Sequence, residues 1–130
     1  MQAGQEAAPL QGLRVMIVED ELLLAMELEE RLQEEGCTVI GPAARTGKAM
    51  DLLLNERPDA VVLDLNLHGE RPTALAEAMV ARRVPFVVVS GYVGRQMDES
   101  ALDNAPRVGK PFRSDELLRV LARTVAAQAA

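Results

Sequence analysis

Short apolar runs alternate along this chain with longer segments in which apolar residues recur every three or four positions. A short unbroken apolar run is typical of a strand buried on both faces of a parallel sheet, and a spacing of three or four is typical of a helix. The runs that predict strands are 13–18, 38–40, 60–64, 85–89 and 107–108. Strands and helices are therefore expected to alternate along the chain.

Each predicted helix carries one apolar stripe that is expected to face the sheet. The stripes are Ala25, Leu28 and Leu32; Ala49, Leu52 and Leu53; Leu75, Ala76, Met79 and Val80; and Leu117, Leu118, Leu121 and Val125. Asp20 is suited to cap the first helix and Gly36 to end it. The segment 93–104 has little apolar surface and predicts only a short or loose helix.

This alternation predicts an α/β fold, a doubly wound five-stranded parallel sheet with helices on both faces. Crossovers between parallel strands are right-handed, so the C-terminal ends of all strands lie along one edge, where such sheets bind ligands. The residues expected at that edge are Glu19, Asp20, Asp64, Ser90 and Lys110. Three carboxylates, one hydroxyl and one ammonium group are thus expected to meet at a single place.

The length and charge of the chain limit the kinds of protein to which it can belong. A chain of 130 residues suits one domain, expected over 12–125, with flexible tails at 1–11 and 126–130. A net charge of -6 makes nucleic acid and anionic membrane surfaces poor expectations as partners. Cys37 is the single cysteine, so it has no disulfide partner in the chain and is expected to be buried. No signal-like or membrane-spanning stretch is found, which predicts a cytoplasmic protein.

The residues at the strand ends suggest phosphoryl chemistry. Clustered carboxylates repel one another and are stabilised by a hard cation that prefers oxygen ligands. Mg²⁺ suits an open acidic pocket, because it takes one or two carboxylates and keeps several waters. A carboxylate such as Asp64 can attack phosphorus, and the Lys110 ammonium and the Ser90 hydroxyl can hold the phosphoryl oxygens. The set therefore predicts Mg²⁺-dependent phosphoryl acceptance.

Each of these residues also has an ordinary explanation when taken alone. Asp20 could be only a helix cap, and Ser90 and Lys110 could be ordinary surface residues. His68 is the only histidine in the chain and is expected in a surface loop, which excludes a metal site with two histidines. The ordinary explanation covers any one residue, but it does not cover all of them at successive strand ends.

The chain resembles the receiver domains of two-component response regulators over about residues 12–125. The resemblance is carried by Glu19-Asp20, Asp64-Leu65-Asn66, Ser90-Gly91 and Lys110-Pro111-Phe112. It implies a flavodoxin-like sheet of order 2-1-3-4-5. It also implies that Asp64 takes a phosphoryl group from a kinase phosphohistidine, while Ser90 and Lys110 hold the phosphoryl oxygens.

The same resemblance implies a magnesium site. Asp20, Asp64 and the backbone carbonyl of Asn66 would bind the ion, and Glu19 would act through a water molecule. Mg²⁺ is thus the expected cofactor.

Two positions depart from the family pattern. His68 stands where receivers often have proline, and Arg107 stands where they usually have the aromatic residue that moves on activation. Val89-Ser90-Gly91-Tyr92 instead resembles the fourth-strand signature of a single-domain subfamily. A guanidinium does not readily enter an apolar space, so Tyr92 is expected to act with Ser90 as the switch.

The chain is accordingly predicted to be a stand-alone response regulator, because nothing after Val125 could form an output domain. Its expected partners are a sensor histidine kinase or phosphotransfer protein and an unidentified downstream protein. It is predicted to catalyse only its own phosphorylation and dephosphorylation.

Two alternatives come from other classes of protein. One is a small Mg²⁺-dependent phosphohydrolase, but a site of the haloacid dehalogenase type requires a second aspartate where this chain has Asn66. The other is a phosphorylation-independent pseudo-receiver, which would lack the acidic pair or the lysine.

Overall fold

The computed structural model of the chain describes residues 9–67, 69–91, 102 and 104–129. The strands are β1 (Arg14–Val18), β2 (Thr38–Ala43), β3 (Ala60–Asp64), β4 (Phe86–Ser90) and β5 (Arg107–Gly109). The helices in this part of the chain are α2 (Leu22–Glu34), α3 (Thr46–Glu56), α4 (Thr73–Ala81) and α6 (Ser114–Ala129). The five predicted strands and the predicted α/β fold are confirmed.

The strands form one parallel sheet in the order β2-β1-β3-β4-β5. In its centre, Val15 of β1 lies beside Ala60 of β3, and Val61 of β3 lies beside Phe86 of β4. The strand order expected from the family resemblance is confirmed. Because every pairing is parallel, all C-terminal strand ends lie at one edge of the sheet.

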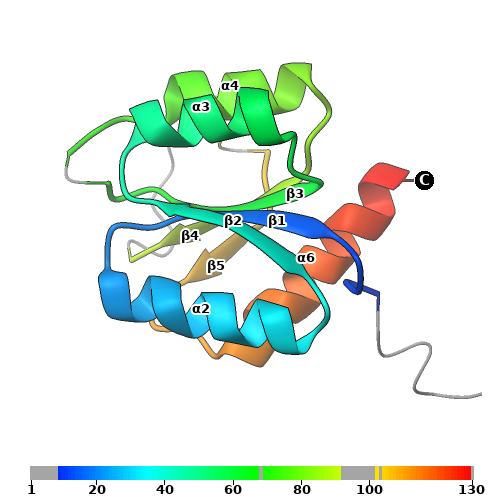
Figure 1. Cartoon of the computed structure of the whole chain (residues 1–130). Helices are drawn as coiled ribbons and strands as arrows, with labels where there is room; N and C mark the ends of the chain where they lie inside the picture. Colours follow the sequence, from blue (N-terminus) through cyan, green and yellow to red (C-terminus); the bar gives the residue numbers. More distant parts are fainter. Residues whose placement is uncertain (1–8, 68, 92–101, 103, 130) are drawn as a thin grey trace, which may run out of the picture.

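Helices cover both faces of the sheet, with α3 and α4 on one face and α2 and α6 on the other (Figure 1). Successive residues of a buried strand point to opposite faces. Ile17 therefore belongs to the same apolar cluster as Leu28 of α2, whereas Met16 belongs to the cluster that contains Leu53 of α3. The central strands are apolar without interruption because each has two packed faces.

The apolar stripes of the helices are largely where the spacing predicts them, but Val80 is an exception. Its side chain is 55% exposed, whereas Leu75, Ala76 and Met79 are buried. Val80 lies at the margin of the stripe in the last turn of α4, and it lines a surface cavity. Cys37 is buried as predicted.

Several boundaries differ from those predicted. The second strand continues past Ile40 to Ala43, whose carbonyl accepts a hydrogen bond from the Glu19 N–H (2.9 Å). Leu10, expected in a flexible tail, is only 2% exposed and packs in the core. The last helix continues to residue 129, because its final residues are mostly alanine, a strong helix former.

The expected capping role of Asp20 is also corrected. The N-cap residue of α2 is Glu21, whose side chain makes no capping hydrogen bond. Asp20 thus lies outside the helix, in the connection that follows β1. None of the helices in the described ranges has both the length and the apolar character needed to cross a membrane.

Candidate functional site

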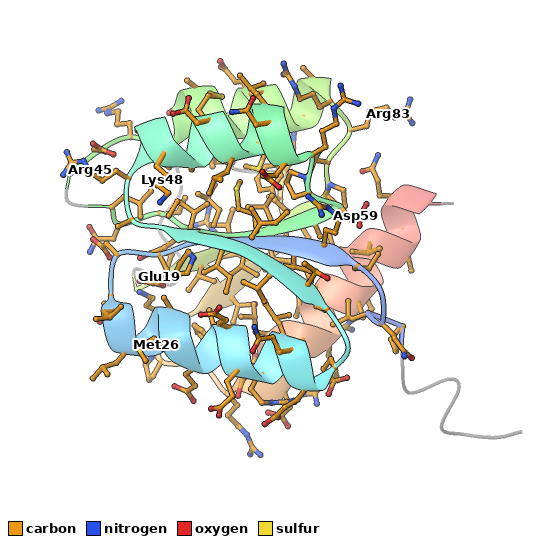
Figure 2. All side chains as sticks on the ribbon, viewed as in Figure 1. Glu19, Met26, Arg45, Lys48, Asp59 and Arg83 are labelled. Atoms are coloured by element: carbon orange, nitrogen blue, oxygen red, sulfur yellow. The ribbon has the colours of Figure 1, made fainter. Side chains whose placement is uncertain are left out.

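The predicted site residues come together at the C-terminal edge of the sheet. Glu19 directly follows β1, Asp64 ends β3, Ser90 ends β4, and Lys110 directly follows β5. Figure 2 shows Glu19 at this edge, at the end of the molecule opposite to Asp59. The parallel sheet therefore assembles in space a set of residues that lie far apart in the sequence.

The Lys110 ammonium makes the central contacts of the site. Its Nζ lies 3.3 Å from Glu19 Oε2, 3.3 Å from Asp64 Oδ2 and 3.2 Å from Glu21 Oε1. The Glu19 and Asp64 side chains are 2% and 1% exposed, and that of Lys110 is 20% exposed. A buried carboxylate is costly without a cationic partner, and Lys110 supplies one to both.

Asp20 completes an acidic cluster with Glu19 and Asp64. One carboxylate oxygen of each residue lies within 4.8 Å of those of the other two. Carboxylates held this close together repel one another. A set of carboxylate oxygen donors fits a hard divalent cation such as Mg²⁺.

The crowding of carboxylates changes the protonation of the site. Burial, together with a hydrogen bond to Asp64, raises the pKa of Glu19 to about 7. Burial lowers the pKa of Lys110, but the charges of Asp64 and Glu19 and the hydrogen bond to Glu21 outweigh it, so the pKa is raised above its ordinary value. Lys110 therefore stays a cation, and the Glu19 carboxyl takes up a proton more readily than an ordinary glutamate does.

Asn66 and Ser90 lie close to the acceptor candidate for different reasons. The Asn66 N–H donates to Asp64 Oδ1 (3.1 Å), so the chain turns back over the carboxylate directly after β3. Ser90 is 3% exposed, and its carbonyl accepts a hydrogen bond from the Lys110 N–H (2.8 Å). Pairing of β4 with β5 thus places Ser90 next to the lysine.

Two glutamates of the site region were missed by the sequence reasoning. Glu21 is not among the residues predicted for the site, yet its Oε1 lies 3.2 Å from Lys110 Nζ. Glu70 accepts hydrogen bonds from the N–H of Thr46 (2.9 Å) and its Oγ1 (3.0 Å), and from Arg45 Nη2 (2.7 Å). No periodicity marks such a contact between a loop and the start of a helix, so the spacing of residues could not reveal it.

The predicted switch residue Tyr92 lies outside the described residues, as do His68 and most of the segment 93–104. Arg107, which replaces the usual aromatic residue, is half-buried in β5 beside Val88. Leu102 is fully buried in the cluster that contains Met79, so this residue contributes to the core.

The family model described as the response regulator receiver domain matches residues 15–122, a range that contains every residue of the site. The chain belongs to this family. The resemblance carried by the strand-end residues is confirmed, and so is the flavodoxin-like receiver fold.

The receiver domain is similar to parts of longer regulators. It is 32% identical over 108 residues to the transcriptional regulatory protein PdtaR of Mycobacterium tuberculosis, a match covering 81% of this chain and 53% of PdtaR. The crystal structure of the response regulator PhyR from Brucella abortus matches with a TM-score of 0.80 at 24% identity, over 98% of this chain and 54% of that one. The chain thus spans about half the length of these two proteins.

A third comparison bears on the acidic cluster. The receiver domain of the sensor histidine kinase PA1611 from Pseudomonas aeruginosa PAO1 matches with a TM-score of 0.76 at 25% identity. The match covers 88% of this chain and 98% of that one, and that structure has a magnesium ion coordinated in its active-site cleft. The acidic cluster of this receiver domain has the donor set that such an ion requires.

Proposed function

We propose that this receiver domain accepts a phosphoryl group on Asp64 from a histidine kinase or phosphotransfer protein and signals to a protein partner. The observation that carries the proposal is the setting of Asp64. Its carboxylate is buried at a strand end, 3.3 Å from the Lys110 ammonium and within 4.8 Å of two other carboxylates. An aspartate placed there for structure alone would not need two acidic neighbours, since these raise the cost of burying it.

In the proposed reaction, a carboxylate oxygen of Asp64 attacks the phosphorus of a phosphohistidine. The new P–O bond forms as the P–N bond breaks, and the electron pair leaves with the imidazole nitrogen. Asp20, Asp64 and the Asn66 carbonyl would hold Mg²⁺, with Glu19 acting through water. The ion, when bound, neutralises charge on the transferring phosphoryl oxygens.

Lys110 is suited to follow the charge during the transfer. Its ammonium is a compact charge on a flexible stem, and it already lies beside the attacking carboxylate. Once Asp64 carries the phosphoryl group, Lys110 can pair with a phosphoryl oxygen in place of a carboxylate oxygen. The Ser90 hydroxyl is proposed to bind another of these oxygens, and that movement is proposed to start the switch that involves Tyr92.

We also propose that the domain over 12–125 acts alone, that the protein is cytoplasmic, and that it binds neither nucleic acid nor membranes. The alternative of a pseudo-receiver is disfavoured because the acidic pair and the lysine are present, and Lys110 contacts both Glu19 and Asp64. The phosphohydrolase alternative is disfavoured because Asn66, not aspartate, follows the acceptor by two residues.

Intact-mass measurement after incubation with acetyl phosphate and Mg²⁺ tests the proposal. The wild-type protein is expected to gain one acid-labile phosphoryl group, and Asp64→Asn is expected to gain none. Asp51→Asn, at an exposed position of α3, is the matched control and should be labelled like the wild type. Labelling of Asp64→Asn at the wild-type yield would refute the assignment of the acceptor.

A further inference from the structure

A second group of charged residues lies at the opposite, N-terminal edge of the sheet. A cleft of about 550 Å³ opens there, where α3 and α4 end and β3 begins. We call it the basic cleft, and its lining includes Arg57, Arg82, Arg83, Asp59, Leu54 and Val84. Figure 2 shows Arg83 and Asp59 at this end of the molecule, far from Glu19.

The arginines of the basic cleft outnumber the acidic groups that line it. Asp59 is the one acidic residue in the described lining, and its Oδ2 already accepts a hydrogen bond from the Arg14 N–H (2.8 Å). The Arg57 and Arg83 guanidinium groups form neither an ion pair nor a hydrogen bond with any described residue. The chain has 20 acidic and 14 basic residues, so a shortage of carboxylates does not explain this.

Helix ends offer an ordinary explanation for positive charge, because arginine can bind the last carbonyl groups and oppose the helix dipole. That role is already filled by other side chains. Arg14 Nη2 donates to the Glu56 carbonyl at the end of α3 (2.6 Å), and Arg82 Nη1 donates to the Ala78 carbonyl in α4 (3.4 Å). Arg57 and Arg83 are left without a capping function.

The backbone at Arg57 and Arg83 also calls for another explanation. Their φ angles are 50° and 59°, and they are the non-glycine residues of the described chain with positive φ. Glycine is the favoured residue at such helix ends. Each arginine precedes the start of a strand by three residues, and the two strands, β3 and β4, are neighbours. Two strained arginines beside one cleft indicate that their side chains have a function.

We propose that the basic cleft binds a small organic phosphate. A phosphate monoester offers three terminal oxygens and up to about two negative charges, which suits several guanidinium groups better than one carboxylate does. Leu54 and Val84 provide apolar surface for the body of the ligand. The exposed Asp59 carboxylate can accept a hydrogen bond from a hydroxyl or amino group. The cleft volume lies within the range of small-molecule sites, about 300–1,000 Å³.

This inference is independent of the proposed phosphorylation, because the two sites lie at opposite edges of the sheet. The test therefore uses the full chain with Asp64→Asn as background, in EDTA, so that neither Mg²⁺ nor the acceptor takes part. Adenosine 5′-diphosphate is the probe, and NMR amide shifts at Leu53, Leu54 and Val84 are the readout. Inorganic phosphate and adenosine are titrated separately.

Arg57→Gly with Arg83→Gly is the decisive variant, because glycine suits both backbone conformations and should keep the fold intact. Removing these charge-assisted hydrogen bonds is expected to weaken binding about 10- to 100-fold. The melting temperature should be unchanged or higher. Arg113→Ala with Arg123→Ala removes the same charge from exposed positions on or beside α6 and should bind like the background protein.

Three results would overturn the proposal. One is the absence of localised shifts with adenosine 5′-diphosphate. Another is equal binding by the glycine variant. The third is equal affinity for inorganic phosphate, which would leave no role for the apolar wall and Asp59. Shifts at the cleft that adenosine 5′-diphosphate causes more strongly than phosphate or adenosine, and that the glycine variant loses, would support it.

Discussion

At the C-terminal edge of the sheet Glu19 and Asp64 are buried and bonded to Lys110, whereas at the N-terminal edge Arg57 and Arg83 are exposed and have no acidic partner in the described part of the chain. Lys110 contacts three carboxylates in the first region, while Arg57 and Arg83 contact none of the described acidic groups in the second. The two regions share one sheet and one set of strands. The difference shows that the sheet fixes where side chains gather, and that the chemistry of each edge depends on the residues at the strand ends.

The largest expected effect comes from removing a carboxylate at the acidic edge. Losing a residue that only supports a metal ligand typically lowers metal affinity or activity ~10- to 100-fold. Asp20 is proposed as a ligand itself, so Asp20→Ala should reduce Mg²⁺ affinity and phosphorylation by at least that factor. Its stability without metal should match or exceed that of the wild type, because one like charge is gone. Magnesium titration by NMR and urea denaturation in EDTA measure the two effects.

Asp51→Ala, on the exposed face of α3, is the matched control and should change neither quantity. A magnesium affinity of Asp20→Ala equal to that of the wild type would mean that the acidic edge does not act as one site.

Removing the cation from the same edge should have the opposite effect on stability. Lys110→Ala leaves buried carboxylates without this cation, so the free energy of unfolding of the metal-free protein should fall by about 1–3 kcal/mol. Breaking a fully buried ion pair costs more, but here a carboxylate can take up a proton and reduce the loss. Urea denaturation in EDTA is the measurement, and added Mg²⁺ should restore part of the loss. Lys48→Ala, an exposed lysine on α3, should be neutral.

At the basic edge, removing a cation should not destabilise the fold. Arg57→Gly and Arg83→Gly should each leave the free energy of unfolding unchanged or raise it by up to about 1 kcal/mol, since glycine relieves the left-handed backbone. Arg82→Gly is the contrast, because its φ is -95° and its guanidinium binds Ala78. Greater stability for Arg82→Gly than for the other two would contradict this account of the basic edge.

The smallest effect is expected at Glu70, which lies beside the acidic edge but is bonded to α3. Hydrogen bonds from Thr46, assisted by the Arg45 charge, hold the pKa of Glu70 below its ordinary value of 4.5. Its stabilising contribution is therefore complete above pH 4.5 and is lost as the pH falls through the lowered pKa. The difference in stability between wild type and Glu70→Gln should shrink between pH 6 and pH 3, as thermal denaturation can measure. A constant difference would argue against the ionised contact.

The strands and the site could be predicted from the sequence because both depend on one feature. Strands buried on both faces are continuously apolar, and the polar residues that end or follow four of the five runs mark the functional edge. The end of β2 was missed because Gly41-Pro42 looks like a strand terminator, yet proline is tolerated in an edge strand such as β2. Val80 was wrongly predicted to be buried, because the spacing of apolar residues does not define where the buried stripe of a helix ends.

The contacts of Glu21, Glu70 and the basic cleft could not be predicted from the sequence. Each joins segments from different connections, and their distance depends on how the helices pack against the sheet. Hydrophobic spacing predicts which face of a helix is buried, but it says nothing about which loops come together. Arg57 and Arg83 are ordinary charged residues in the sequence, and only their backbone angles distinguish them.

The bond between Glu70 and Thr46 has a mechanical consequence. Glu70 lies in the loop between β3 and α4 that starts at the acceptor, and its N–H donates to the Leu67 carbonyl within that loop (2.8 Å). Its carboxylate holds the first N–H of α3. A displacement of the loop must therefore either pull the start of α3 with it or break that bond. The amide exchange rate of Thr46, at the start of α3, should therefore report on movements of the loop that follows Asp64.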